Sequence, residues 1–160
     1  MKKRIIECVI MLAIAMVLIA LDLVTKVMAS SSLSMHSFTL IPNLIEFIYT
    51  ENTGAAFGML SNNTWFLVGF TAIFLVVFIL FDIFNHSNNW FYRLGYVMVL
   101  AGAIGNLVDR IAFGFVRDFI AISFFPFIFN VADIFITIGT ILLMIYVIFY
   151  MFNTDTKEKK

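Results

Sequence analysis

The sequence predicts an all-α integral membrane protein: a four-transmembrane-helix bundle with a small β-rich extracytoplasmic cradle between the first and second helices. Apolar residues make up 62% of the chain and charged residues only 12%, whereas soluble domains have about 45–50% and about 25%. The mean hydropathy is +1.04. Four apolar runs reach about 20 residues, the length that crosses the hydrocarbon core of a bilayer. With 160 residues, the chain is expected to form a single membrane domain, residues 1–160.

The first span is predicted at about residues 5–28, directly after the cations at positions 2–4. A charged start followed by an apolar run is also typical of a secretory signal peptide. This run is long for a signal peptide, and three further spans follow it. We therefore expect a retained transmembrane helix.

The other spans are predicted at about residues 65–84, 90–113 and 129–152. Trp65 and Trp90 stand at the start of two of them, where amphipathic aromatic side chains anchor a helix at the membrane interface. Polar residues precede each of these two tryptophans. The second and third spans are therefore each preceded by a polar connection.

The segment at about 30–63 is the largest piece expected outside the membrane. Its residues 44–50 are rich in β-formers and predict a strand or short hairpin. Asn52, Thr53 and Gly54 then predict a turn. This segment is expected to form the cradle on the outer membrane surface.

The distribution of cations predicts the orientation. The cations at positions 2–4 and 157–160 are expected to hold both termini in the cytoplasm, which requires an even number of spans. Residues 30–63 and the connection between the third and fourth spans then face outward. Arg110 and Arg117 lie on that outer side against the rule, so each needs a specific reason to be there.

Polar side chains gather at one depth of the predicted bundle. Ionisable groups in a span cost a few kcal/mol each, which makes each one a functional candidate. The polar residues are Asp22 and Lys26 in the first span, Asn106, Asp109 and Arg110 in the third, Asp118 in the short outer loop that follows, and Asn130 and Asp133 at the start of the fourth. All lie at the outer ends of the spans or, for Asp118, in the outer loop beside them, whereas chance would scatter them between both ends.

Several of these residues also have a purely structural interpretation. Asp22 and Lys26 are four positions apart and either form a structural ion pair or take part in chemistry. Asn130 is a candidate helix cap, with Asp133 favourably placed in the positive first turn. The small residues at 101–105 favour close helix packing over catalysis.

Other function classes find little support. Cys8 is the single cysteine, which excludes an internal disulfide. His36 and His86 are the two histidines, and no Cys/His cluster has metal-ligand spacing, so we expect no metal and no cofactor. The formal net charge of zero gives no electrostatic reason for a nucleic-acid partner.

Asp118 and Asp133 remain as a candidate pair. They are 15 positions apart, flank an outer loop and lie beside amide and guanidinium donors. Two carboxylates brought close at low dielectric cannot both ionise easily and share a proton. One can then activate water as a base while the other protonates a leaving amine. This is the chemistry of an aspartic peptidase, and the spacing permits it.

Five motifs together resemble the bacterial lipoprotein signal peptidases (signal peptidase II), in order and over nearly the whole chain. They are Asp22–Lys26, Asn52–Gly58, Ala101–Arg110, Gly114–Ile120 and Phe129–Asp133. The resemblance implies a multi-pass enzyme of the bacterial cytoplasmic (inner) membrane, with the catalytic pair Asp118 and Asp133 near the outer face. Its substrate would be a diacylglyceryl-modified prolipoprotein, cut on the amino side of the lipidated cysteine.

The resemblance also implies roles for other residues. Substrate binding and dyad orientation would fall to Asn52, Gly54, Asn106, Arg110 and Asn130, with Gly54 to Phe57 near the site. Asp22 and Lys26 would be supporting residues. Membrane lipid is an expected partner, nucleic acid is not, and a monomer is expected.

Two positions depart from the family pattern. Arg117 stands where an apolar residue is expected, and its cation could favour the ionised form of Asp118 or simply point to water. Ile134 stands where serine is more frequent. Neither departure removes a candidate catalytic carboxylate.

Two alternatives stay open. A small proton-coupled transporter or channel could use the same acids, but it should carry polar residues through the full membrane depth. Residues 70–81 of the second span contain no charge. An inactive assembly or scaffold protein of the same fold is opposed only by the retention of both aspartates.

Overall fold

The computed structural model describes residues 2–54, 63–85 and 87–158, and within them it has four long helices and one antiparallel sheet. The elements in chain order are α1 (Lys2–Ser32), β1 (Phe38–Ile41), β2 (Ile45–Asn52), α2 (Thr64–Asn85), α3 (Trp90–Phe113), β3 (Val116–Ile122), β4 (Ile128–Phe129) and α4 (Val131–Glu158). All four helices are long and apolar enough to cross a membrane. The predicted fold class is confirmed.

The helix α3 has the bounds that the sequence predicts because both of its ends are capped. The Asn89 side chain accepts hydrogen bonds from the backbone N–H groups of Phe91 and Tyr92. Gly114 has a φ of 84° at the other end and donates its N–H to the Arg110 carbonyl. Helix α1 extends beyond the predicted span 5–28 at both ends, whereas α4 begins inside the predicted span 129–152, at Val131, and extends past its end to Glu158.

The sheet has the strand order β1-β2-β3-β4. Strands β2 and β3 are antiparallel, with Thr50 opposite Asp118 and Asn52 opposite Val116. The β-rich segment predicted between the first and second helices is present as β1 and β2. Strands β3 and β4, between α3 and α4, complete the sheet, so the prediction of a loop at Asp118 was wrong. Residues 116–122 alternate across the sheet as β3, and pairing with β2 holds them extended.

Helix α3 is the centre of the bundle and packs against the other three helices, most extensively α4. A Cβ on Gly95 would lie 2.8 Å from the Gly139 carbonyl oxygen, and one on Gly102 would lie 2.5 Å from that of Ala132. The backbones of α3 and α4 therefore approach as closely as glycine allows. The predicted packing role of residues 101–105 is confirmed.

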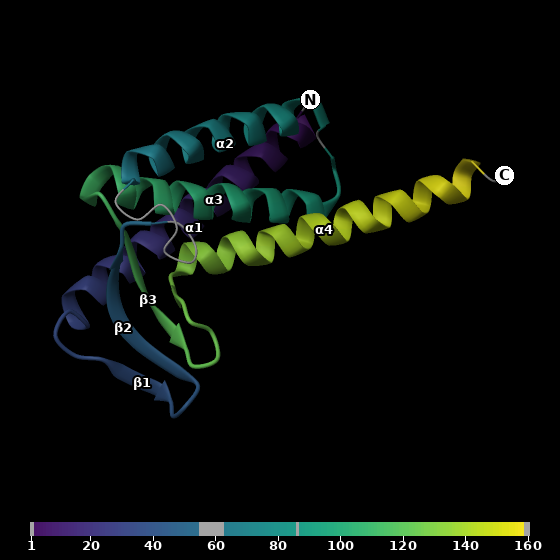
Figure 1. The fold of residues 1–160 in the computed structure, drawn as a ribbon. Coiled ribbons are helices and arrows are strands. Elements are labelled where there is room, and N and C mark those ends of the chain that lie inside the picture. The colour runs from purple at the N-terminus through teal and green to yellow at the C-terminus, as the bar shows by residue number, and fades with distance from the viewer. Residues whose placement is uncertain (1, 55–62, 86, 159–160) are drawn as a thin grey trace.

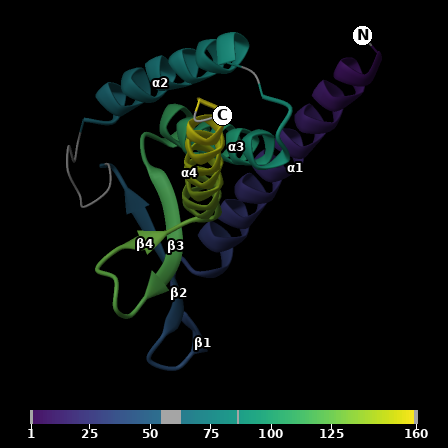
Figure 2. The same ribbon diagram turned by 90° about the vertical axis from the view of Figure 1, so that its right-hand side faces the viewer.

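The strands lie at one end of the bundle, beside the carboxyl-terminal part of α1 and the start of α4 (Figures 1 and 2). We call this end the sheet end and the opposite one, where α2 ends and α3 begins, the far end. Apolar side chains such as Val17 and Ile73 are largely exposed, as lipid-facing residues would be. Asp22, Lys26 and Asp109 are fully buried at the sheet end.

Candidate active site

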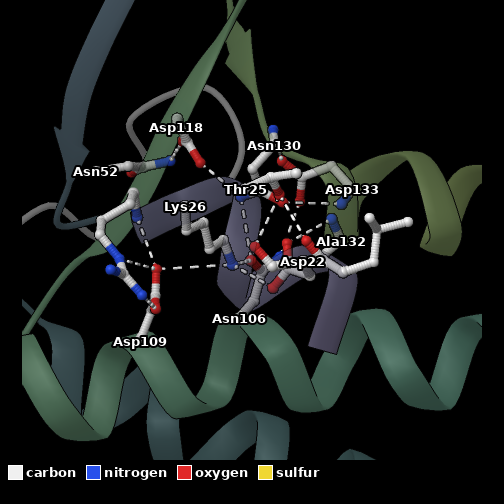
Figure 3. A network of polar contacts seen from close by, with 12 residues as sticks. Asp22, Thr25, Lys26, Asn52, Asn106, Asp109, Asp118, Asn130, Ala132 and Asp133 are labelled. Atoms are coloured by element: carbon white, nitrogen blue, oxygen red, sulfur yellow. Dashed lines mark hydrogen bonds and ion pairs between the residues drawn. The ribbon is translucent and has the colours of Figure 1, made fainter. Parts of the chain in front are cut away.

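The predicted polar residues converge at the sheet end from α1, β2, α3, β3 and the start of α4 (Figure 3). The predicted residues that Figure 3 labels are Asp22, Lys26, Asn52, Asn106, Asp109, Asp118, Asn130 and Asp133. The sequence predicted that these residues lie at one depth, and the structure shows which of them form hydrogen bonds and ion pairs with one another.

The start of α4 forms a reciprocal cap. The Asp133 N–H donates to Asn130 Oδ1 at 3.0 Å, and the Asn130 N–H donates to Asp133 Oδ2 at 3.1 Å. The capping interpretation is therefore confirmed. The cap leaves the Asn130 Nδ2 group free to turn toward Asp118, to which it donates at 2.6 Å.

Both carboxylate oxygens of Asp118 accept a hydrogen bond from an asparagine. Asn130 bonds Oδ1, and Asn52 Nδ2 donates to Oδ2 at 2.8 Å. The Asn52 oxygen in turn accepts the Gly54 N–H at 3.0 Å. Because the oxygens of both asparagines take backbone donors, neither amide can flip without losing a bond, and both present N–H groups to Asp118.

Asp133 is held in a similar way through Asn106. Asn106 Nδ2 donates to Asp133 Oδ1 at 2.8 Å. The Asn106 oxygen accepts from Lys26 Nζ at 2.8 Å and from Asn130 Nδ2 at 3.1 Å. Asn106 and Asn130 thus link the two carboxylates into one network.

Asp118 lies outside the spans and is only 3% exposed. Burial and, second to it, the negative charge of Asp133 raise the pKa of its carboxyl to about 6. The hydrogen bonds from Asn52 and Asn130 and the charge of Lys26 act in the opposite direction. Asp118 therefore keeps a proton at mildly acidic pH.

A neutral cluster of two anions and two cations lies behind the carboxylates. Lys26 Nζ is 2.9 Å from Asp22 Oδ2 and 3.6 Å from Asp109 Oδ2. Arg117 Nη2 is 2.6 Å from Asp109 Oδ1. Asp22 Oδ1 also accepts the Ala132 N–H at 2.9 Å, which ties α1 to the first turn of α4.

Arg117 neither lies beside the Asp118 carboxylate nor points to water, the two placements expected from the sequence. Its guanidinium bonds Asp109 through Nε and Nη2 and lies 4.5 Å from the Phe113 ring centre. Adjacent residues of a strand point to opposite faces, so Arg117 in β3 faces the buried cluster while Asp118 faces away from it. Sequence reasoning missed this pair because it read the segment as a loop; recognising the strand would have separated the two side chains.

The carboxylates line a groove of about 640 Å³ at the sheet end. Its polar lining includes Asn52, Gly54, Asn106, Arg110, Asp118 and Asp133, and its apolar lining includes residues 125–129 and Ile136. Arg110 Nη2 donates to the Gly54 carbonyl at 3.0 Å.

Some predicted residues lie away from this groove. Asp22 and Lys26 are buried behind it, and Asn130 does not line it but donates a hydrogen bond to Asp118. Ile134 is 40% exposed, and Ala55, Ala56 and Phe57 lie outside the described residues. Across the part of the chain that the structure describes, no three His, Cys, Asp or Glu residues are grouped to hold a metal ion.

Residues 14–149 match the family model of signal peptidase (SPase) II. The chain belongs to the signal peptidase II family. Curated relatives include the lipoprotein signal peptidase of Clostridioides difficile, 37% identical over 86% of this chain and 93% of that protein. Another is the lipoprotein signal peptidase of Caldanaerobacter subterraneus subsp. tengcongensis, 43% identical over 81% of this chain and 89% of that protein.

Two solved structures share the fold of this chain. A bacterial membrane enzyme superposes with a TM-score of 0.80 at 35% identity, over 94% of this chain and 91% of that chain. A second bacterial membrane enzyme gives a TM-score of 0.78 at 34% identity. The predicted family resemblance is confirmed, and the chain is a multi-pass membrane protein.

Proposed function

We propose that this member of the signal peptidase II family is a membrane aspartic endopeptidase. It removes the signal peptide from diacylglyceryl-modified prolipoproteins and cuts on the amino side of the lipidated cysteine. The relatives named lipoprotein signal peptidase support the substrate class. The observation that carries the mechanism is that Asp118 and Asp133 line one groove and are linked through Asn106 and Asn130.

The two carboxylates take different roles in this mechanism. Asp118 holds the shared proton, since burial raises its pKa to about 6. Asp133 lies in the first turn of α4, where the positive end of the helix dipole favours a carboxylate. Asp133 is therefore the base and Asp118 the acid.

The proton transfers balance over one cycle. Asp133 takes a proton from water as the water oxygen attacks the scissile carbonyl, and Asp118 gives its proton to the carbonyl oxygen. The resulting gem-diol collapses when its hydroxyl returns a proton to Asp118 and Asp133 protonates the leaving amine. Both carboxyl groups end in their starting states.

The remaining groove residues bind and orient the substrate. Asn52, Asn106 and Asn130 fix the carboxylates, while Arg110 holds the Gly54 carbonyl at the groove wall. The aromatic lining at residues 125–129 offers an apolar surface to the lipid on the substrate cysteine. Asp22 and Lys26 support this arrangement from behind.

The orientation is part of the proposal. We infer from the cations at positions 2–4, 157, 159 and 160 that both termini lie in the cytoplasm of a bacterium. The sheet end then faces outward, and the groove opens near the outer leaflet of the plasma membrane. The chain acts there as a single domain and as a monomer.

A gel-shift assay tests this proposal. The purified protein in detergent is incubated with a diacylglyceryl-modified prolipoprotein and with its unlipidated form, and a chelator is added in a parallel reaction. We expect loss of the signal peptide from the lipidated form only, with or without the chelator. A folded sample that cleaves neither form but carries protons across vesicle membranes would instead support the alternative of a small proton-coupled transporter or channel.

A further inference from the structure

A second groove of about 670 Å³ lies at the far end, between α2, α3 and α4. We call it the tyrosine basin. Its described lining is Phe78, Phe81, Phe84, Asn85, Ser87, Asn88, Tyr92, Tyr96, Leu143, Tyr146, Val147 and Tyr150. None of these residues carries a formal charge, yet the basin holds four of the five tyrosines of the chain.

The tyrosine rings form a connected wall. The ring centres of Tyr92 and Tyr146 are 5.1 Å apart, and those of Tyr146 and Tyr150 are 6.1 Å apart. Tyr96 stacks on Phe78 of α2 with ring centres 4.7 Å apart. Tyr150 is 61% exposed, so part of this wall is open to a ligand from outside the bundle.

The electrostatics of the basin favour a cation. The faces of aromatic rings carry negative potential and attract ammonium and guanidinium groups. The Tyr92 hydroxyl donates to Asp82 at 2.9 Å, which places a carboxylate behind the wall. Helix α2 ends at Asn85 in the basin, and helix carboxyl termini favour cations.

Arg93, the cation of α3 next to Tyr92, is paired. Its Nη1 is 3.0 Å from Glu7 of α1, and its Nε and Nη2 bond the Ser87 carbonyl and the Asn88 side chain. Arg93 lines a separate cavity of about 220 Å³ between α1 and α3. The Arg93 guanidinium thus bonds two residues that line the basin, Ser87 and Asn88, and the Glu7 carboxylate balances its charge.

The tyrosine basin lies on the same side of α3 as the candidate active site. A small cavity between α2, α3 and α4 includes Phe70, Phe74 and Ala103 in its lining and shares Asn106, Arg110 and Ile136 with the active-site groove. Asn106 and Tyr92 are 14 positions apart on α3, which corresponds to about 21 Å along a helix. A signal peptide has an apolar segment of about 7–15 residues after its cationic start, so a helical signal peptide has the length to join the two sites.

We propose that the tyrosine basin binds the cationic amino-terminal segment of the prolipoprotein's signal peptide through cation–π contacts. The inference rests on the proposed function and its orientation, which put the far end and the start of the signal peptide on the cytoplasmic side. The basin then selects substrates that carry Lys or Arg about one helical apolar segment before the cleavage site.

The test compares two lipidated prolipoproteins that differ only in having two Lys or two Gln residues in the cationic segment. For the unaltered enzyme, KM is expected to be about fivefold lower for the Lys substrate. In the double variant Tyr146→Leu with Tyr150→Leu, this KM ratio is expected to fall to about one. The double variant Tyr146→Phe with Tyr150→Phe keeps the ring faces and should keep the ratio.

The matched control is Phe149→Leu, which removes a 65% exposed aromatic ring of α4 that does not line the basin. This variant should keep the KM ratio of the unaltered enzyme. Equal KM values for both substrates with the unaltered enzyme would overturn the inference. An equal rise in KM for both substrates in the Leu double variant would also overturn it, because it would indicate a lipid site or a structural role.

Binding is measured in parallel, by fluorescence polarisation of labelled substrates with the Asp118→Asn variant, so that no turnover is needed. Cation-dependent binding without cleavage by the unaltered enzyme would refute the proposed function and retain the basin as a cation site. Cleavage without cation-dependent binding would refute the basin and retain the peptidase.

Discussion

Replacing Lys26 by methionine is the most informative perturbation of the buried network. The Lys26 side chain is fully buried, and its Nζ lies 2.9 Å from Asp22, 3.6 Å from Asp109 and 2.8 Å from the Asn106 oxygen. Methionine fills similar space without a charge. The cluster would then hold two anions and only one cation, Arg117.

The expected loss of stability follows from this imbalance. Removing one partner of a buried ion pair costs about 3–5 kcal/mol because the other charge is left uncompensated. For a chain of this length each kcal/mol lowers Tm by about 2–4 °C, so we expect a fall of about 6–20 °C. Cleavage should also fall by about tenfold or more, because Asn106 loses the donor that helps to orient it toward Asp133.

Thermal unfolding in detergent, followed by tryptophan fluorescence, measures the first effect, and the lipoprotein cleavage rate measures the second. The matched control is Val24→Met, at a 55% exposed position of the same helix. Adding Asp22→Asn to Lys26→Met restores charge balance and should recover most of the lost Tm. A Tm of Lys26→Met within about 2 °C of the unaltered protein would refute this expectation. So would a double variant whose Tm is no higher than that of Lys26→Met.

Three further outcomes are expected. Because Asp118 must hold a proton and has a pKa raised to about 6, kcat/KM should fall about tenfold per pH unit above that value; a flat profile from pH 5 to 8 would contradict this. Gly105→Ala should unfold at lower temperature and lose activity, since a Cβ there would meet the Asp22 carboxylate, whereas Gly69→Ala has open space and should change neither. Arg117→Val should lower Tm by a similar amount to Lys26→Met, with cleavage retained at low temperature because Arg117 faces away from the groove; an unchanged Tm would show that its pair with Asp109 contributes nothing.

The sequence could predict the spans and the depth of the polar residues because both depend on local composition. The α3 bounds came out correctly because Asn89 and Gly114 are strong capping residues on either side of an apolar run. The motif order also identified the family. These signals do not require knowledge of distant contacts.

The pairing of the polar groups depended on tertiary structure. Asn52 and Asp118 are 66 positions apart, and only the β2–β3 ladder brings them together. Strand β3 was not predicted because its partner β2 is separated from it in the chain by α2 and α3. Without the strand, the opposite directions of Arg117 and Asp118 could not be predicted. The hydrogen bonds that fix the asparagine amides likewise join residues from different elements, which the sequence alone does not bring together.

The central claim is that Asp118 and Asp133 act as one catalytic unit. The most direct measurement is the single-turnover cleavage rate of a lipidated prolipoprotein by Asp118→Asn, by Asp133→Asn and by the double variant, each checked for folding by thermal unfolding. Both single variants should lose at least about a thousandfold in rate, and the double variant should be no worse, since the effects of residues in one catalytic unit are not additive. Substantial turnover by either folded single variant, or a further large loss in the double variant, would contradict it.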